Sequence, residues 1–144
     1  MTDVLDAFAL VALALDEPAA AEVEALLRRG DAVMTTTNLG EALDQLHRVG
    51  GQPIDELQAQ LAPLLGRAVT LLDVDARLMW RAVELRGHHY RRRTAELSLA
   101  DCVALAAAEP GADRLVTADA ALAAAARAES VELVALPASD GRRP

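Results

Sequence analysis

Four acidic residues occupy positions where their carboxylates could act together: Asp6, Glu41, Asp101 and Asp119. Asp6 closes one short apolar stretch, and Asp119 lies just past another. Glu41 and Asp101 fall in the first turns of two predicted helices. Grouped carboxylates repel one another unless cations lie among them. Their oxygens suit Mg²⁺ or Mn²⁺, which can activate a water for phosphodiester cleavage, so the four acids indicate metal-dependent hydrolysis.

Each of these acids also has a simpler interpretation as a helix cap. Asp6 and Asp119 directly precede predicted helices, where an aspartate accepts a backbone N–H. Glu41 could form a capping box with Asn38, and Asp101 could do so with Ser98. From the residues alone, capping and metal binding both stay open.

The elements that must position these acids alternate along the chain. Apolar stretches predict strands that end at Asp6, Thr35, Leu72, Val116 and Leu136. Helical spacing predicts helices over 7–15, 19–29, 39–49, 53–65, 75–85, 98–109 and 119–128, with a turn at Pro110-Gly111. Alternating strands and helices predict an α/β fold with a central parallel sheet covered by helices. Ligands gather beyond the carboxyl ends of such strands, where the acids are expected.

Composition limits the protein to a few classes. The chain has 144 residues, of which 53% are hydrophobic, and a net charge of −8. We expect one domain over 1–137 and a flexible tail over 138–144. All 14 basic residues are Arg, which excludes a P-loop and lysine Schiff-base chemistry. The N-terminal stretch lacks a basic run and is too short to span a membrane, so a cytoplasmic protein is expected.

Four short motifs, in order, resemble those of the PIN-domain family, and in particular VapC-type toxin ribonucleases. The first is Val4-Leu5-Asp6-Ala7 with Leu10-Val11-Ala12-Leu13, and the second is Thr37-Asn38-Leu39-Gly40-Glu41-Ala42-Leu43. The third is Leu97-Ser98-Leu99-Ala100-Asp101-Cys102, and the fourth is Leu115-Val116-Thr117-Ala118-Asp119. The likeness runs from Val4 to Leu136.

This resemblance implies a PIN-like, Rossmann-like three-layer fold and a metal-dependent endoribonuclease. It implies that Asp6, Glu41, Asp101 and Asp119 bind Mg²⁺ or Mn²⁺, with support from the Thr117 hydroxyl. It also implies an RNA substrate, a cognate antitoxin and a homodimer. Phe8 departs from the pattern, because the family commonly has Ser or Thr there, which puts the surroundings of Asp6 in question.

Two further features bear on function. Arg91, Arg92 and Arg93 form the densest positive group, and we expect them to contact RNA phosphates. Trp80 is expected in the core, with an interface as the alternative. A housekeeping RNA-processing nuclease and an inactive PIN-like binding module both remain open; the four intact acids argue against the second.

Overall fold

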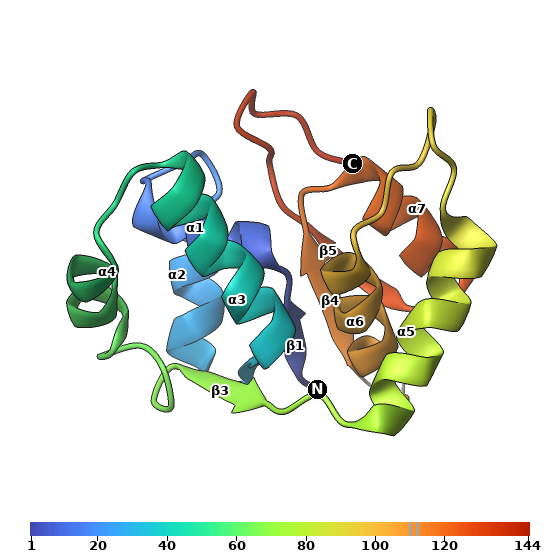
Figure 1. Cartoon of the computed structure of the whole chain (residues 1–144), viewed down its shortest axis with the longest axis horizontal. Coiled ribbons are helices and arrows are strands. Elements are labelled where there is room, and N and C mark those ends of the chain that lie inside the picture. The colour runs from blue at the N-terminus through green and yellow to red at the C-terminus, as the bar shows by residue number, and fades with distance from the viewer. Residues whose placement is uncertain (110, 112) are drawn as a thin grey trace.

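A parallel five-stranded sheet forms the centre of the computed structural model, which describes residues 1–109, 111 and 113–144 (Figure 1). The strand order is β3-β2-β1-β4-β5, and every neighbouring pair is parallel. The fold class predicted from the sequence is therefore confirmed. The strands are β1 (Asp3–Leu5), β2 (Ala32–Thr35), β3 (Val69–Leu72), β4 (Arg114–Thr117) and β5 (Glu132–Ala135).

Helices connect these strands and cover both faces of the sheet (Figure 1). Pro110, in the predicted turn between α6 and β4, lies outside the described residues. The helices are α1 (Ala7–Ala14), α2 (Ala20–Arg29), α3 (Thr36–Asp44), η1 (Gln45–Val49), α4 (Ile54–Leu61), α5 (Ala76–His89), α6 (Leu99–Ala108) and α7 (Ala120–Ala128).

The alternation of side chains along the strands divides the core into two halves. Leu5 of β1 packs with Met34 and Val116, together with the buried residues of α1 and α2. Val4, one residue earlier, faces the other side and packs with Leu115 and the buried residues of α6 and α7. Successive side chains of a strand point to opposite faces, so one short strand supports both layers. Central strand β1 is thus fixed from both sides, which also fixes Asp6 at its end.

Three helices differ from the sequence-based prediction, and one of them, expected over 53–65, ends at Leu61. The helix expected from residue 39 begins at Thr36, because the Thr35 hydroxyl accepts the backbone N–H of Asn38 and so caps it. Its last five residues form the π-helix η1. The helix expected to end at Leu85 continues to His89. The predicted core position of Trp80 is wrong: this side chain on α5 is 77% exposed.

The segment after β5, residues 137–144, folds back over the molecule. Arg143 donates to the backbone oxygen of Ala135 and pairs with Glu22 of α2. Arg127 of α7 donates to the backbone oxygen of Pro144 at 3.0 Å. We call this segment the arm. None of the helices in the described part of the chain is long and apolar enough to cross a membrane.

Candidate active site

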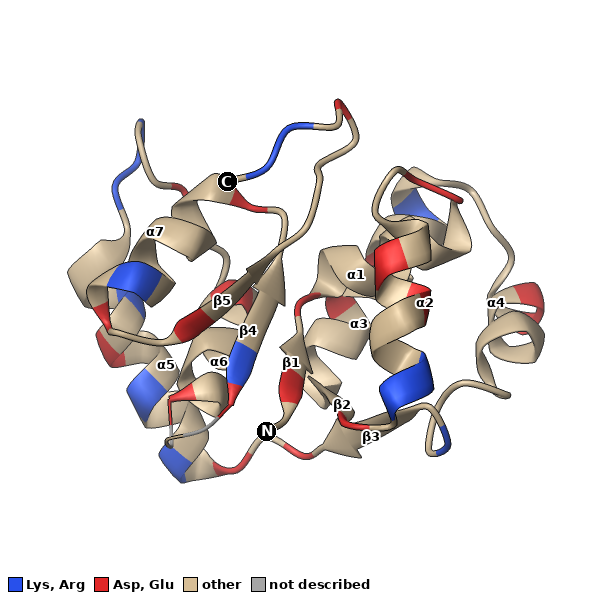
Figure 2. Ribbon diagram, turned by 180° about the vertical axis from the view of Figure 1, so that it is seen from behind, with Lys and Arg blue, Asp and Glu red and all other residues tan. Residues whose placement is uncertain are grey.

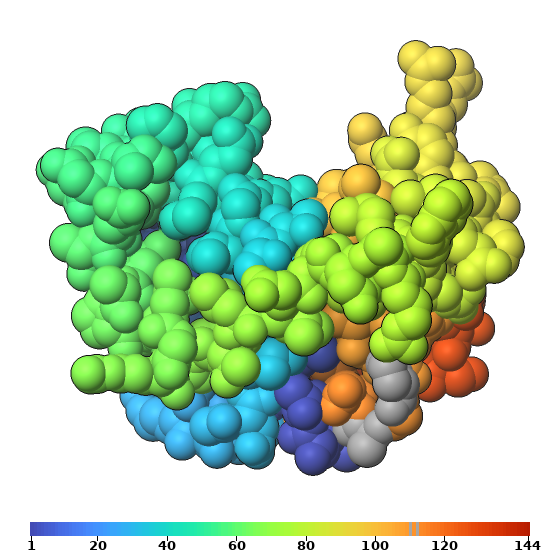
Figure 3. All heavy atoms as spheres, turned by 60° about the horizontal axis from the view of Figure 1, so that its bottom comes forward, coloured from blue at the N-terminus to red at the C-terminus, as the bar shows by residue number. Residues whose placement is uncertain are grey.

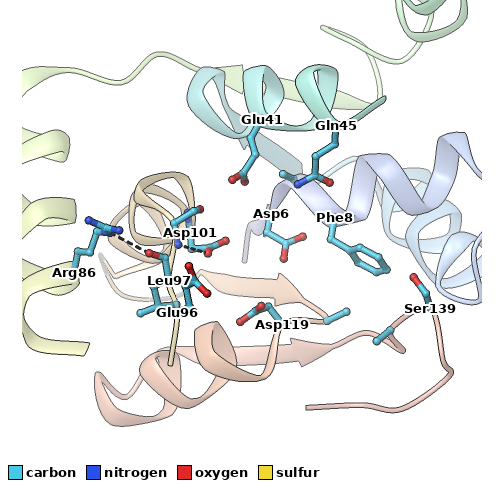
Figure 4. Close-up of a pocket in the computed structure, with 14 residues that line it drawn as sticks. Asp6, Phe8, Glu41, Gln45, Arg86, Glu96, Leu97, Asp101, Asp119 and Ser139 are labelled. Carbon is cyan, nitrogen blue, oxygen red and sulfur yellow. Dashed lines mark hydrogen bonds between the residues drawn. The ribbon is translucent and has the colours of Figure 1, made fainter. Parts of the chain in front are cut away.

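An open cleft of about 560 Å³ lies at the carboxyl edge of the sheet, and all four predicted acids line it (Figure 4). Asp6 follows β1, Asp119 follows β4, Glu41 comes from α3 and Asp101 from α6. The carboxylates point into the same space from different sides. In the space-filling view, two prominences flank a hollow, one around η1 and the other at the loop between α5 and α6 (Figure 3). The fold thus brings together acids that are up to 113 residues apart in the sequence.

Asp6 is the most deeply placed of the four acids, with an exposure of 3%. One carboxylate oxygen accepts the backbone N–H of Ala9 at 3.1 Å and caps α1, while the other accepts the Thr117 hydroxyl. Burial raises the pKa of Asp6 to about 7, since desolvation disfavours the charged form. Asp101 and Asp119 raise it further, and the two hydrogen bonds oppose the rise. At neutral pH, Asp6 is therefore poised between its protonated and charged forms.

Asp101 closes a capping box at the start of α6. Its carboxylate accepts the backbone N–H of Ser98 at 2.7 Å, and the Ser98 hydroxyl accepts the N–H of Asp101 at 3.0 Å. Burial raises the pKa of Asp101 to about 6, and the charges of Glu41 and Asp119 raise it as well. Two acids of the cleft thus have pKa values shifted towards neutrality, a pattern common at functional sites.

Thr117 joins Asp6 to Asp119. Its buried hydroxyl donates to Asp6 and accepts the backbone N–H of Asp119 at 2.9 Å. One Asp119 oxygen caps α7 by accepting the N–H of Leu122 at 2.7 Å. A single hydroxyl therefore sets the position of Asp6 relative to the strand–helix junction that carries Asp119.

Glu41 reaches the cleft from the second turn of α3, and a buried amide fixes that helix against α6. Asn38 is fully buried, and its side-chain nitrogen donates to the backbone oxygen of Ala100 at 3.1 Å. Asn38 therefore does not form the predicted alternative capping box with Glu41. Because Ala100 precedes Asp101, this bond ties the two helices that carry Glu41 and Asp101.

Three of the four acids cap a helix and also line the cleft, so the capping interpretation is confirmed and the site interpretation stays a prediction. Asp6, Asp101 and Asp119 each cap a helix while lining the cleft. A carboxylate has two oxygens, so one can satisfy a helix end while the other faces a ligand. Capping adds precision here, because it fixes each acid to the backbone at the sheet edge.

Comparison with known proteins now decides the family. The PIN domain model matches residues 4–128, most of the chain. The chain belongs to the PIN domain family. No curated protein sequence matches it. Its fold is similar to that of three solved structures from toxin–antitoxin systems, each below 25% identity.

These three structures illustrate the similarity. The toxin VapC20 of Mycobacterium tuberculosis, described as cleaving the sarcin-ricin loop, is 20% identical with a TM-score of 0.67, over 86% of this chain and 95% of its own. VapBC2 of Rickettsia felis, bound to a promoter DNA fragment, is 19% identical with a TM-score of 0.65, over 93% and 98%. A toxin–antitoxin complex from Klebsiella pneumoniae is 16% identical with a TM-score of 0.56, over 82% and 87%.

Several residues of this PIN domain line the cleft without having been predicted from the sequence. Glu96 is a fifth acid there, and Arg86 brings a cation, with its Nε donating to the backbone oxygen of Leu97 at 3.0 Å. Arg86 also lies over the Tyr90 ring, with 4.7 Å from guanidinium carbon to ring centroid. Glu96 sits in a loop, where no periodicity marks it. Arg86 lies one residue past the predicted end of its helix at residue 85, so helical spacing did not assign it to a face.

Arg91, Arg92 and Arg93 lie in the exposed loop between α5 and α6, away from the four acids. A bridge between Arg91 and Ala95 closes this loop, which projects beside the hollow (Figure 3). Blue segments mark the tip of this loop and the part of the arm next to the C-terminus, and both lie on the same side of the PIN domain (Figure 2). The three arginines are not among the residues that line the cleft, and their RNA contact stays a prediction.

The donor chemistry of the cleft fits a divalent cation. Carboxylate oxygens are the preferred ligands of Mg²⁺ and Mn²⁺. The raised pKa values of Asp6 and Asp101 show that these acids lie where a compensating positive charge would favour their ionised forms. Within the described residues, no three His, Cys, Asp or Glu side chains lie close enough together to hold a metal ion as they stand. The acids surround an open cleft, and binding a cation requires them to converge on it.

Proposed function

We propose that this PIN domain is a metal-dependent endoribonuclease and the toxin of a toxin–antitoxin pair. The observation that carries this proposal is the arrangement of Asp6, Glu41, Asp101 and Asp119 around one cleft, from four different elements. Two of them have raised pKa values, and the cleft that they line is open to solvent. RNA as the substrate is supported by the family and by the similar toxin described as cleaving the sarcin-ricin loop.

In this proposal the four acids hold Mg²⁺ or Mn²⁺. When bound there, such a cation would supply an activated water and would stabilise the leaving oxygen of a phosphodiester. Thr117 orients Asp6 and keeps one of its oxygens engaged. Arg86 offers a guanidinium to a phosphate at the edge of the cleft, and Arg91, Arg92 and Arg93 attract the strand from the projecting loop. In a protein with a net charge of −8, such local cations must supply the attraction for RNA.

Two alternatives keep the same fold. A catalytically inactive binding module does not require four acids around one cleft, so their arrangement favours the enzyme. A housekeeping RNA-processing nuclease would use the same site without an antitoxin. The toxin is favoured because two similar structures carry toxin–antitoxin descriptions. A short reading frame upstream that encodes a DNA-binding protein would support the toxin over the housekeeping enzyme.

The proposed partners are a cognate antitoxin, which blocks the cleft, and a second copy of the chain. Self-association is supported by an apolar strip on the outer face of α5. Trp80 and Val83 of this strip are 77% and 51% exposed. Ala76 and Met79 lie beside them along the same shallow hollow. A cytoplasmic location agrees with this role.

The test is cleavage of RNA by the purified protein. Total RNA and a pool of synthetic oligonucleotides would be incubated with Mg²⁺, with Mn²⁺ and with EDTA. We expect cuts at defined positions with either cation and none with EDTA. Uncut RNA under all conditions, from folded protein free of antitoxin, would reject the proposed activity.

A further inference from the structure

Phe8 places an aromatic ring at the cleft, two residues after Asp6. It is the only Phe of the chain, and it stands where the family resemblance led us to expect Ser or Thr. Phe8 belongs to α1, and its half-buried side chain packs against the core. The ring also lines the cleft, beside the acids and facing Ser139 (Figure 4). Phe8 therefore contacts the core and also leaves part of its side chain at the cleft, where a bound molecule can contact it.

The arm supplies the opposite wall of this part of the cleft. Two of its residues, Ala138 and Ser139, are among those that line the cavity. A tight turn shapes the arm there: the N–H of Ala138 donates to the backbone oxygen of Arg142 at 2.7 Å, and that of Gly141 donates to the oxygen of Ala138 at 2.8 Å. A small side chain and a hydroxyl thus face an aromatic ring.

A two-point ion pair holds the arm in this position. Arg143 donates to both carboxylate oxygens of Glu22, at 3.0 and 2.5 Å, and to the backbone oxygen of Ala135 at 2.6 Å. The bond to Arg143 lowers the pKa of Glu22. Because the contact joins the arm to α2, it ties the arm to the body of the molecule near the sheet edge.

We propose that Phe8, Ala138 and Ser139 form a nucleobase subsite that selects which phosphodiester the acids receive. The inference rests on the proposed ribonuclease function. Single-stranded RNA is recognised by stacking unpaired bases on aromatic rings and by hydrogen bonds to their edges. A phosphate held at the four acids carries its neighbouring base towards the Phe8 ring. The Ser139 hydroxyl can then donate to or accept from that base or its ribose.

The experiment pairs changes in the protein with changes in the RNA. The substrate is an oligonucleotide containing a bond that the parent cuts, with a series in which one nucleotide near that bond is abasic. Phe8→Leu keeps an apolar side chain without the ring, and Phe8→Tyr keeps the ring. We expect one abasic position to lower parental kcat/KM by roughly five- to 100-fold, the range of a lost base–aromatic stack. Phe8→Leu should cause a similar loss on intact RNA and none beyond it on that abasic RNA.

Binding gives a second readout that does not depend on cleavage. Fluorescence anisotropy of the same labelled RNA, measured in EDTA, should show weaker binding by Phe8→Leu and unchanged binding by Phe8→Tyr. For the arm, Glu22→Arg or Arg143→Glu alone should reduce the preference for particular bases, and the double charge reversal should restore it. Glu24→Arg breaks a surface pair with Arg28 on the same helix and serves as the matched control.

The outcomes separate this subsite from the proposed activity. Cleavage by the parent, with independent losses from Phe8→Leu and from every abasic position, would overturn the subsite and leave the nuclease intact. The subsite would also be overturned if Phe8→Leu changed inhibition by a protein partner but left RNA cleavage and RNA binding unchanged. A parent that neither cuts nor binds RNA would overturn both. Circular dichroism checks the folding of each variant. Ser139 is exposed, so Ser139→Ala tests the subsite without disturbing the core.

Discussion

At the scale of single residues, Asp119 shows how one carboxylate serves both the helix and the site. One oxygen caps α7, so replacing the side chain with an amide leaves an oxygen to accept the same N–H. Asp119→Asn should therefore fold normally. It should lower Mg²⁺-dependent cleavage by more than the ~10–100-fold that is typical for partners of metal ligands, because a neutral amide is a poor ligand for a hard cation.

Thermal unfolding with and without Mg²⁺ provides the check on this prediction. A cation stabilises the state that binds it, so the parent should gain more in Tm than Asp119→Asn. Asp75→Asn, at the equivalent cap of α5 and outside the cleft, is the matched control. Equal gains in Tm together with full cleavage by Asp119→Asn would mean that Asp119 only caps the helix.

The buried position of Asp6 predicts how the stability of the metal-free protein depends on pH. The pKa is 3.8 in the unfolded chain and about 7 in the fold, so the folded state binds more protons between these values. The free energy of unfolding should therefore fall as pH rises from about 4 to 7, and the loss is complete above the folded pKa. At about 1.4 kcal/mol per pKa unit, the loss from Asp6 is on the order of 4 kcal/mol at most.

Urea unfolding at a series of pH values in EDTA would measure this effect. Asp6→Asn should make the decline shallower and leave the part below about pH 6 that Asp101 contributes, while Asp55→Asn, on the exposed surface of α4, should leave the whole decline in place. Mg²⁺ should also flatten the parental decline, since a cation favours the ionised carboxylate. A stability that rises from pH 4 to 7 in EDTA, equally in the parent and Asp6→Asn, would contradict the assignment.

At the scale of elements, most of the fold follows from local sequence patterns. The strands Ala32–Thr35 and Val69–Leu72 end at the residues predicted from the sequence, because short apolar runs between turn-forming residues favour buried strands. The start of α3 was missed because the Thr35 hydroxyl caps it from within the strand end. The π-helix η1 was also missed, since its hydrogen bonds depend on tertiary packing and leave no periodic signal.

The link between α3 and α6 predicts that a residue outside the cleft controls it. Asn38→Leu removes the bond to the backbone oxygen of Ala100 and leaves that buried oxygen without its side-chain donor. We expect a loss of about 1–3 kcal/mol in the free energy of unfolding, typical of an unsatisfied buried group. Without this bond, the helices that carry Glu41 and Asp101 are less firmly held together. The two carboxylates should then be less well placed in the cleft, and kcat should fall as well.

Chemical denaturation and single-turnover cleavage on the same preparations would test this link. Thr37→Ala, one residue earlier and partly exposed, is the control and should change neither quantity by much. If Asn38→Leu lost stability but kept its full cleavage rate at saturating RNA and Mg²⁺, Asn38 would stabilise the fold without positioning the acids.

At the scale of the whole molecule, the sequence indicated which residues meet but not what surrounds them. The four acids could be predicted because each follows a strand or lies near the start of a helix. In a parallel sheet these positions lie at the same edge. Glu96, Arg86 and the arm residues reach the cleft through loops, whose paths depend on long-range contacts such as Arg143 with Glu22. The exposure of Trp80 escaped prediction because a large apolar residue usually signals a core, and helical spacing alone does not say which face is covered.

The exposed apolar strip on α5 predicts that the chain self-associates. Trp80 and Val83 lie exposed on the outer face of α5, with the half-buried Met79 beside them, and none of the three lines the cleft. A second copy could bury the same strip by two-fold symmetry, the commonest way for soluble proteins to assemble. Trp80→Glu places a charge in that contact, which is costly to bury without a partner.

We expect sedimentation velocity at micromolar concentration to show a dimer for the parent and a 15.2 kDa monomer for Trp80→Glu. Val49→Glu, at a 71% exposed apolar residue outside the strip, should stay dimeric. A dimer that survives Trp80→Glu but not Val49→Glu would move the interface to η1, and a monomeric parent would remove the second copy from the proposed partners.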